Sequence, residues 1–338
     1  MSQSSAIGQI HPARASRKSS NAGVLLRVNG LNHQTSTRVP LGEVKPTIYS
    51  ILGSKPTITS TKAPSVSNDI RSSSSSKNLA DHTDYENEIY KYLNDIEGSN
   101  LPQPSLFEDQ SNITPKMRAT LIDWLVEVHN KLNMQQDTLY YTVSYIDRYL
   151  MERDLDKSKF QLLGTAAILI AAKTEEIYPP HCEKLVHYAG DSFTVIGLQR
   201  MESSLLNVLE FSTNPVVTSQ FLRRFISIAN ADSMMNSFAN YISELILLDS
   251  EFLGILPSKL TAAIIFYAMQ ITHNASSLNQ DFEKKIGYSM KDISQIMNMI
   301  HKSIQNAAAS RFQAIRKKYA TAQREFVSTI EIPKEMLF

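Results

Sequence analysis

Apolar side chains recur three and four positions apart over most of the chain, which is the spacing of one face of an α-helix. From residue 81 onward the pattern predicts a short helix carrying Tyr85 and longer amphipathic helices over 115–128, 139–150 and 195–209. The segment 160–173 is apolar on nearly every side, and such a helix is buried at the centre of a bundle. No stretch alternates apolar and polar residues for long enough to predict a strand. The pattern therefore predicts an all-α fold.

Prolines and their neighbours divide this helical pattern into segments. Thr114 followed by Pro115 is an N-cap residue with a proline at the first helical position, and it predicts a helix start. Asn214 and Pro215 repeat the signal and predict the start of a second series of helices. The segment 178–180, Tyr-Pro-Pro, interrupts the first series.

The two helical series contain the same short sequence. Thr-Ala-Ala-Ile occurs at 165–168 and again at 261–264, and a repeat at so long an interval indicates a duplicated domain. Small residues at the same place in both copies predict a central helix that its neighbours approach closely. Gly164 fits this role, although glycine costs about 1 kcal/mol relative to alanine inside a helix. Ahead of each copy we expect a helix that ends at an aspartate followed by apolar residues, at Asp147 and at Asp249.

The first 80 residues differ in composition from the rest of the chain. They are rich in Ser, Thr, Pro and Lys, have Tyr49 as their one aromatic residue, and include the serine run 72–76. Such a segment cannot bury enough apolar surface to offset the entropy of ordering it. We therefore predict a disordered regulatory tail over 1–80, a first helical domain over 81–212 and a second over 213–338.

Charge and cysteine content exclude several classes of protein. The chain has 34 Lys and Arg against 33 Asp and Glu, and a net charge of +1 lacks the positive field of a nucleic-acid binder. A single cysteine, Cys182, rules out an internal disulfide and fits a reducing compartment. The polar start 1–14 shows no secretory signal, and the longest apolar run, 162–172, is about half of a bilayer span. We expect a soluble intracellular protein with no nucleic-acid or membrane partner.

Motifs for catalysis and cofactor binding are absent from the sequence. The eight histidines include no His-Glu-x-x-His pattern, and His181 and His187 lie near Cys182 without a second pair of metal ligands. No phosphate-binding glycine loop and no Gly-x-Ser-x-Gly turn occurs. Glu175 and Glu176 follow the buried helix, where they are either a general acid and base or charged residues at a helix exit. We favour the second interpretation and expect a binding module, not an enzyme, with no catalytic residue, metal or cofactor.

Three motifs, in order along the chain, resemble the cyclin box. They are Met-Arg-Ala-Thr-Leu-Ile-Asp-Trp-Leu-Val-Glu-Val at 117–128, Tyr-Ile-Asp-Arg-Tyr-Leu at 145–150, and Gly-Thr-Ala-Ala leading to Lys-Thr-Glu-Glu-Ile-Tyr-Pro-Pro at 164–180. The resemblance extends from about residue 81 to the end and is closest to mitotic cyclins of the A/B group. The third motif and Gln-Ala-Ile-Arg-Lys-Lys-Tyr at 313–319 resemble the A-type. The family fold implies two five-helix repeats flanked by short helices.

The resemblance implies a regulatory subunit that binds and activates a cyclin-dependent kinase. Lys173 and Glu202 match the lysine and glutamate with which cyclins contact the surroundings of the kinase C helix. On the residues alone, Lys173 would be a cation completing a helix C-terminus, worth about 0.3–1 kcal/mol, and Glu202 would lie on a solvated face. The apolar part of this interface is expected from Phe160, Tyr85, Ile89 and Tyr90.

A second surface implied by the resemblance takes up Arg-x-Leu peptides of substrates and inhibitors. The matching positions lie on the first helix of the box or at its rim: Met117, Leu121, Trp124, Glu127 and Gln161. Spacing of three and four places the first three on one helical stripe, which is also the pattern of a core face. We assign Leu125 and Val128 to the core. Thr120 stands where the family usually has an aliphatic residue, and we expect the lost apolar contact to weaken docking by about 1 kcal/mol.

A segment of the predicted tail resembles the destruction box of mitotic cyclins. It spans 38–44, with Arg38 and Leu41 as its core, and Lys45 and Lys55 lie nearby as ubiquitin acceptors. The resemblance implies recognition by the ubiquitin ligase that ends mitosis, followed by ubiquitin-dependent degradation.

The competing interpretation is a transcription-factor-IIB-like adaptor, which also has two cyclin folds but binds DNA and polymerase. Such a protein needs a basic surface and usually a zinc ribbon, and the net charge and the single cysteine count against both. A small basic cluster at Arg14, Arg17 and Lys18 is either a nuclear address or a set of ordinary tail charges. We expect the protein in the nucleus and cytoplasm, acting in S phase or at mitotic entry.

Overall fold

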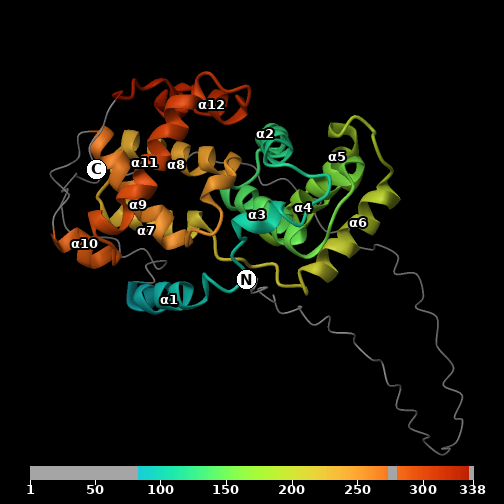
Figure 1. Cartoon of the computed structure of the whole chain (residues 1–338), viewed down its shortest axis with the longest axis horizontal. Coiled ribbons are helices and arrows are strands. Elements are labelled where there is room, and N and C mark those ends of the chain that lie inside the picture. Colours follow the sequence, from blue (N-terminus) through green and yellow to red (C-terminus); the bar gives the residue numbers. More distant parts are fainter. Residues whose placement is uncertain (1–82, 273–279, 335–338) are drawn as a thin grey trace, which may run out of the picture. The chain divides into compact units, whose positions relative to one another are not determined.

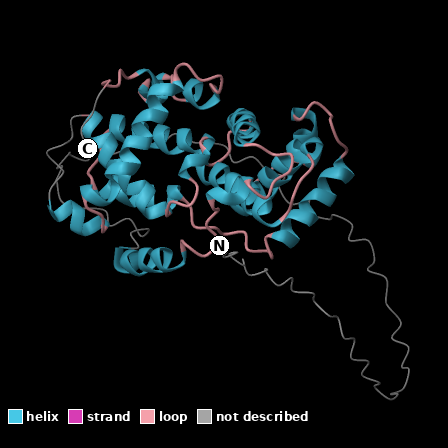
Figure 2. Ribbon diagram, in the orientation of Figure 1, coloured by secondary structure: helices cyan, strands magenta, loops and turns pink. Residues whose placement is uncertain are grey.

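The structure is a computed structural model that describes residues 83–272 and 280–334 (Figure 1). Within these ranges the chain forms helices and loops and no strand, which confirms the predicted all-α fold (Figure 2). The predicted tail over 1–80, with Arg38 and Leu41, lies outside the described residues.

Twelve α-helices make up the described part of the chain. They are α1 (Thr83–Ile96), α2 (Pro115–Lys131), α3 (Gln136–Glu152), α4 (Phe160–Glu175), α5 (Cys182–Tyr188), α6 (Val195–Val208), α7 (Thr218–Ile228), α8 (Ser233–Leu245), α9 (Pro257–Ile271), α10 (Gln280–Ile286), α11 (Met290–Ala307) and α12 (Ala314–Lys318). Helices α2–α6 form a first repeat and α7–α11 a second, with α1 before them and α12 after them. This arrangement confirms the two five-helix repeats flanked by short helices.

The start of α2 follows from its first residues. Thr114 has an extended backbone, and its hydroxyl accepts a hydrogen bond from the Met117 N–H at 3.3 Å. Pro115 occupies the first turn, where its missing N–H costs nothing. The predicted cap is therefore confirmed.

The repeated Thr-Ala-Ala-Ile segments occupy equivalent places in the two central helices. Residues 165–168 of α4 and 261–264 of α9 are all buried. The Thr165 hydroxyl donates to the Gln161 carbonyl at 2.8 Å, and the Thr261 hydroxyl donates to the Pro257 carbonyl at 2.7 Å. Each buried hydroxyl is thus satisfied within its own helix, four residues back. The internal duplication seen in the sequence is a structural one.

Gly164 is the point at which α2 approaches α4. A Cβ atom placed on Gly164 would lie 2.8 Å from Leu121 Cδ1 and 3.1 Å from Leu121 Cδ2. Leu121 is itself buried, so its side chain has little room to move. The predicted close approach is confirmed, and α2 is the neighbour that makes it.

Two details of the predicted repeat are wrong. Asn214 and Pro215 do not begin a helix, because α7 starts only at Thr218. Side chains of α3 hold the connecting segment instead: the Tyr145 hydroxyl donates to the Thr213 carbonyl at 2.5 Å and Arg148 donates to the Ser212 carbonyl at 2.8 Å. The segment therefore serves as the link between the repeats.

The two aspartates expected at helix ends also differ from the prediction. Asp147 lies inside α3, which continues to Glu152, whereas Asp249 follows α8 in a loop of short 3₁₀ turns. Asp249 caps one of these turns by accepting from the Glu251 N–H at 3.0 Å. Asp147 is buried in an ion pair, so the two residues have unrelated roles.

Arg118 connects the first repeat to the second. Its Nε and Nη2 donate to the two carboxylate oxygens of Asp147 at 2.6 and 2.7 Å, and its Nη1 donates to the Leu247 carbonyl at 2.8 Å. Apolar contacts reinforce this connection, because Ile122 of α2 and Leu139 of α3 belong to the core of the second repeat. The two repeats thus share α2 and α3.

The N-terminus of α3 is held by side chains from two other segments. One oxygen of the Glu176 carboxylate accepts from the Gln135 N–H and from the Thr138 hydroxyl, each at 2.6 Å. The His129 Nε2 donates to the Gln135 carbonyl at 2.7 Å, and the buried His129 Nδ1 has no partner among the described residues. Burial lowers the pKa of His129, and the nearby Lys318 ammonium lowers it further.

We predict that Gly164→Ala destabilises the protein by about 1–3 kcal/mol, because the new methyl group overpacks against Leu121. Gly197, in the first turn of α6, provides a matched control, since a Cβ there would approach nothing closer than 3.4 Å. Gly197→Ala should stabilise by up to about 1 kcal/mol. Urea unfolding measures the change in free energy of unfolding for each variant, and the two changes should have opposite signs. Stabilisation by both substitutions would show that α2 and α4 are not in close contact.

Stability should decline on acidification because His129 is held neutral. The unfolded chain binds a proton at a histidine pKa of about 6.5, whereas the native state resists it, so stability is complete above this pH and falls below it. We expect a loss of up to about 1.4 kcal/mol at pH 5.5, one unit below the unfolded value. His129→Gln should flatten the dependence of the urea midpoint on pH. His187→Gln, at a side chain that is 81% exposed, should leave this dependence unchanged. Equal slopes of the urea midpoint against pH in all three proteins would contradict the role given to His129.

Candidate functional site

The structure brings Lys173 and Glu202 together. Lys173 lies in the last turn of α4, and its Nζ donates to Glu202 Oε1 of α6 at 2.5 Å. The Lys173 side chain is 49% exposed and the Glu202 side chain 13%. A pair this close to solvent contributes at most about 1 kcal/mol to stability. The two groups are therefore available to a partner at little cost to the fold.

Helix α1 has one face packed on the second repeat. The Tyr90 hydroxyl donates to the Gln220 carbonyl at 3.2 Å, and the Tyr90 ring packs against Phe221 with centroids 6.1 Å apart. The Arg224 guanidinium lies 4.3 Å from the centre of the same ring. Tyr90 was predicted among the exposed aromatic residues of the kinase interface, but it anchors α1 within the molecule.

The opposite face of α1 is apolar and lacks a partner among the described residues. Tyr85 is 63% exposed and Ile89 49% exposed, as the prediction requires. Tyr92, which the sequence reasoning missed, is 62% exposed. The spacing of four and three from Tyr85 to Ile89 to Tyr92 is the signal that could have identified it. We call these three side chains the α1 stripe.

The surface beside the α1 stripe continues onto the first repeat. A cavity of about 270 Å³ is lined by Tyr92 of α1, by Ser144 of α3, and by Ser212 and residues 214–216 of the connecting segment. Phe211, just after α6, is also largely exposed. The end of α6, the helix that carries Glu202, therefore lies near this apolar surface.

Phe160 does not contribute to that surface. Its side chain is 5% exposed and belongs to the core of the first repeat. The first residue of α4 is buried because nearly every side of this helix is covered. Beyond the other end of α4, Ile177 and Tyr178 are almost fully exposed. The sequence places both residues in the third cyclin motif and Tyr178 in a break between helices, but neither was predicted at an interface.

The predicted docking stripe on α2 is half core and half surface. Met117 and Trp124 are partly buried and pack against the first core, whereas Leu121 lies beneath them in contact distance of Gly164. Leu125 and Val128 are buried, as assigned. At the rim, Glu127 is exposed and Gln161 is half-buried. We call Met117, Trp124 and the underlying Leu121 the α2 patch; Leu121 is its floor and does not offer a contact surface of its own.

Thr120 lies beside the α2 patch and is engaged by the distant C-terminal segment. Its hydroxyl donates to the Lys116 carbonyl at 2.8 Å and accepts from Arg311 Nη2 at 2.6 Å. One turn further along α2, the Asp123 carboxylate accepts from the Ala314 N–H at 2.9 Å. Burial raises the pKa of Asp123. Residues 311–314 therefore run along one edge of α2, beside α12 (Figure 1).

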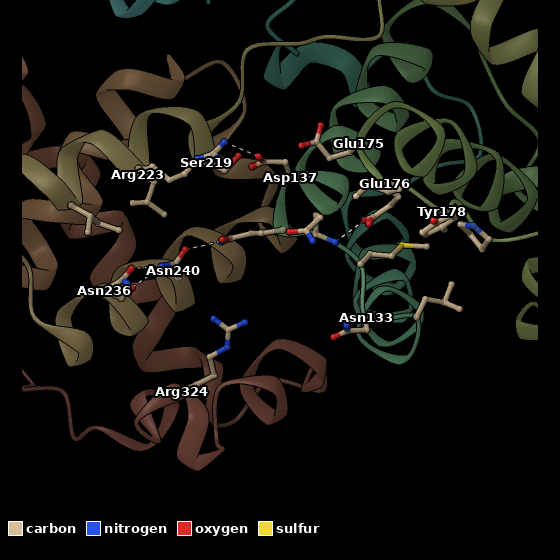
Figure 3. A pocket seen from close by; sticks show the side chains of 18 of the residues that line it. Asn133, Asp137, Glu175, Glu176, Tyr178, Ser219, Arg223, Asn236, Asn240 and Arg324 are labelled. Atoms are coloured by element: carbon tan, nitrogen blue, oxygen red, sulfur yellow. Dashed lines mark hydrogen bonds and ion pairs between the residues drawn. The ribbon is translucent and has the colours of Figure 1, made fainter. Parts of the chain in front are cut away.

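A cavity of about 920 Å³ lies between the two repeats. Figure 3 shows Arg223 and Asn240 of the second repeat facing Asp137 and Glu176 of the first. Arg223 donates to Asp137 at 2.7 Å, and Gln136 donates to Asn240 at 2.7 Å. These bonds cross the cavity and hold its walls together.

Two of the three carboxylates that line this cavity have structural roles, Asp137 in its ion pair with Arg223 and Glu176 at the N-terminus of α3. Glu176 caps α3, and Glu175 lies beside it without a nucleophile or a histidine in hydrogen-bonding contact. Burial raises the pKa of Glu175, and the Asp137 carboxylate raises it further. The interpretation of Glu176 as a charged residue at a helix exit is confirmed with an added role, since its carboxylate also accepts from the N–H of Gln135, the residue before α3, and from the Thr138 hydroxyl.

The described residues offer neither a metal-binding cluster nor a membrane-spanning helix. No three His, Cys, Asp or Glu side chains of the described residues are grouped to hold a metal ion. Among the helices that the structure describes, none combines the length and apolarity needed to cross a bilayer.

Two family models match consecutive parts of the chain. The cyclin N-terminal domain matches residues 88–214, and the cyclin C-terminal domain matches residues 216–333. The boundary between them falls in the segment that connects α6 to α7. Together they span the two five-helix repeats and most of α1 and α12.

Curated relatives and a solved structure give the same family. Cyclin-A2 of Gallus gallus is 34% identical over 260 residues, which cover 77% of this chain and 66% of the relative. Cyclin-A1 of Homo sapiens is 36% identical over 256 residues, covering 75% of this chain and 55% of the relative. The viral cyclin from herpesvirus saimiri, 19% identical, superposes with a TM-score of 0.57 over 64% of this chain and 96% of the viral one, and it supports the fold alone.

The matches span somewhat more than half the length of these curated relatives. They are spread over both repeats, and the motifs at 117–128, 145–150 and 164–180 lie within the first of the two matched domains. From its two matched domains, its duplicated five-helix fold and its A-type relatives, we conclude that the chain belongs to the cyclin family.

Proposed function

We propose that this protein is the regulatory subunit of a cyclin-dependent kinase and that it activates the kinase by binding it. The observation that carries the proposal is the α1 stripe. Tyr85, Ile89 and Tyr92 lie on a helix whose other face is already packed, and they leave a row of large apolar side chains in water. Such a row marks a protein interface, because large aromatic residues are enriched at the centres of interfaces.

The charged part of the proposed interface is the pair Lys173 and Glu202. Both matched the kinase-contacting residues of cyclins, and in the folded chain they form one ion pair between the last turn of α4 and the middle of α6, with Lys173 about half exposed and Glu202 mostly buried. A kinase backbone that approaches the pair would accept from the ammonium and donate to the carboxylate. Because the pair is preformed, little side-chain entropy is lost on binding.

The proposed mechanism is a shift of a conformational equilibrium. A protein kinase transfers phosphate only when its strand lysine pairs with the glutamate of its C helix. A subunit that binds only the arrangement with that helix turned inward shifts the kinase toward it by the difference in affinity. Moving the equilibrium from 1:99 to 99:1 requires about 5.5 kcal/mol of differential binding. The regulatory subunit supplies surface and no catalytic group.

We also propose that the α2 patch recruits substrates and inhibitors that contain Arg-x-Leu. Met117 and Trp124 present an apolar surface above Leu121, and the exposed Glu127 offers a carboxylate for the arginine. This surface is on a different helix from those that carry the proposed kinase contacts. Recruitment and activation are therefore separable by mutation.

Lys173→Ala combined with Glu202→Ala should abolish activation of the kinase while leaving the fold intact. Loss of a desolvated charged contact at an interface costs about 2–5 kcal/mol, or roughly 30-fold to several-thousand-fold in Kd. The measurement is calorimetric titration of the full chain against purified cyclin-dependent kinases, with phosphorylation of a short peptide as the activity.

The matched control for that test is Arg223→Ala with Asp137→Ala. This pair has similar geometry, 2.7 Å, and similar exposure, 70% and 13%, but it lies in the cavity between the repeats. The control should bind as the wild type does. If the Lys173 and Glu202 double variant also binds as the wild type does, the proposed contact is refuted.

Met117→Ala combined with Trp124→Ala should lower phosphorylation of substrates that contain Arg-x-Leu and spare a peptide that lacks it. Truncation of two partly buried apolar residues removes about 2–4 kcal/mol of docking contact. The readout is kcat/KM for the two substrates, together with the circular dichroism melting curve of the variant. Equal losses on both substrates, with a lowered melting temperature, would show that the stripe is core.

A further inference from the structure

We propose that Arg311 gives the α2 patch a second charge preference, so that docked peptides carry an acidic residue shortly after the leucine of Arg-x-Leu. This inference rests on the proposed docking function and adds to it a residue from the far end of the chain. In three dimensions Arg311 borders the patch, although 191 positions separate it from Thr120 along the sequence.

The position of Arg311 is fixed by two contacts. Its Nη2 donates to the Thr120 hydroxyl at 2.6 Å, and its guanidinium lies 4.7 Å from the centre of the Phe312 ring. The Ala314 N–H, which donates to Asp123, holds the following backbone against the same helix. A guanidinium held in this way is oriented before a peptide arrives.

The positive charge of Arg311 is not neutralised by an acidic side chain within the described part of the chain. It forms no ion pair there, and both of its contacts are with neutral groups. It also lines a groove of about 440 Å³ that begins at Pro115 and Lys116, next to the α2 patch. Asp249 lines the same groove and contributes one negative charge, with one carboxylate oxygen accepting from the Glu251 N–H. Lys116 and the N-terminus of α2 add positive potential, so the groove favours a carboxylate.

The two charged groups beside the α2 patch are the Glu127 carboxylate and the Arg311 guanidinium. They have opposite sign and lie at different positions along the axis of α2. Thr120, which holds Arg311, and Glu127 are seven residues apart on nearly the same edge, which corresponds to about 10 Å along the helix axis. An extended peptide covers this distance in about three residues. With the peptide arginine at Glu127 and the leucine over Met117 and Trp124, the residues that follow reach Arg311. The acidic residue is therefore expected one to three positions after the leucine.

This geometry also changes the meaning of Thr120. The aliphatic residue usual in cyclins would add apolar contact, whereas the hydroxyl here accepts from Arg311. The substitution exchanges general apolar affinity for discrimination by charge, because a polar site rejects ligands that lack the matching group more strongly than an apolar site does.

The test uses the full chain and fluorescent peptides that share an Arg-x-Leu core. Glutamate is placed at each of the three positions after the leucine, and each peptide is paired with a glutamine and a lysine version. Fluorescence anisotropy should show at least one glutamate peptide binding roughly two- to five-fold more tightly than its glutamine version, with the lysine version weaker still. The preference should shrink as the salt concentration rises.

Three variants assign the preference to its cause. Arg311→Glu should reverse the order of the glutamate and lysine peptides, whereas Arg200→Glu, an equal charge change on α6, should leave the order unchanged. Thr120→Val, which removes the acceptor of Arg311, should tighten binding of all peptides and reduce the ratio between glutamate and glutamine.

The outcomes separate this inference from the docking function itself. If all peptides bind the wild type but Arg311→Glu leaves the glutamate-to-lysine ratio unchanged, the role of Arg311 is refuted and docking stands. If no peptide binds the wild type, and Trp124→Ala has no effect on any of them, the docking function fails and takes the inference with it.

Discussion

The buried pair between Arg118 and Asp147 is the constraint on which the surfaces of this protein depend. Replacing such a pair by apolar residues is often neutral, whereas removing one partner leaves a buried charge and costs about 3–5 kcal/mol. The pair therefore adds little to the free energy of folding, and its main effect is to fix how the helices are oriented. The planar guanidinium contacts both Asp147 oxygens and the Leu247 carbonyl, so it fixes the rotation of α2 about its own axis and the approach of the second repeat.

The rotation of α2 determines which of its faces are available to partners. Ile122 is buried in the second core and Leu125 in the first, so two sides of the helix are used in joining the repeats. Leu121 lies on the same side of the helix as Leu125 and also enters the first core, where Gly164 leaves room for it. The strip with Met117 and Trp124 reaches the surface, beside the exposed Thr120 and Glu127. A rotation of one residue, 100° in an α-helix, would bury these two and expose the residues that join the repeats.

The features that could be predicted from the sequence are those that depend on neighbours along the chain. The cap at Thr114, the burial of α4 and the small residues of the central helices follow from local spacing and chemistry. Asn214 was misread because Tyr145, far back in the chain, holds the connecting segment extended. The contact between Arg311 and Thr120 could not be predicted, because no periodicity links residues so far apart.

The residues of the candidate site also divide into those that local spacing predicts and those that depend on distant parts of the chain. Tyr85 and Ile89 could be recognised from helical spacing, but the choice between Tyr90 and Tyr92 depended on which side of α1 meets the second repeat. That choice is made by Gln220 and Phe221, which belong to the second repeat. Amphipathic spacing alone cannot distinguish the two faces of a helix that is apolar on both.

The size of the α1 stripe limits the binding free energy that it can supply alone. Full burial of three large apolar side chains contributes about 1.5–3 kcal/mol each, or roughly 4–9 kcal/mol together. Association costs about 4–15 kcal/mol in lost translational and rotational freedom, so the stripe by itself leaves little net affinity. A stable complex therefore needs apolar surface beyond α1. Phe211 after α6 and Tyr178 after α4 remain exposed at the ends of the same two helices that carry the charged pair, and they are the groups that can supply it.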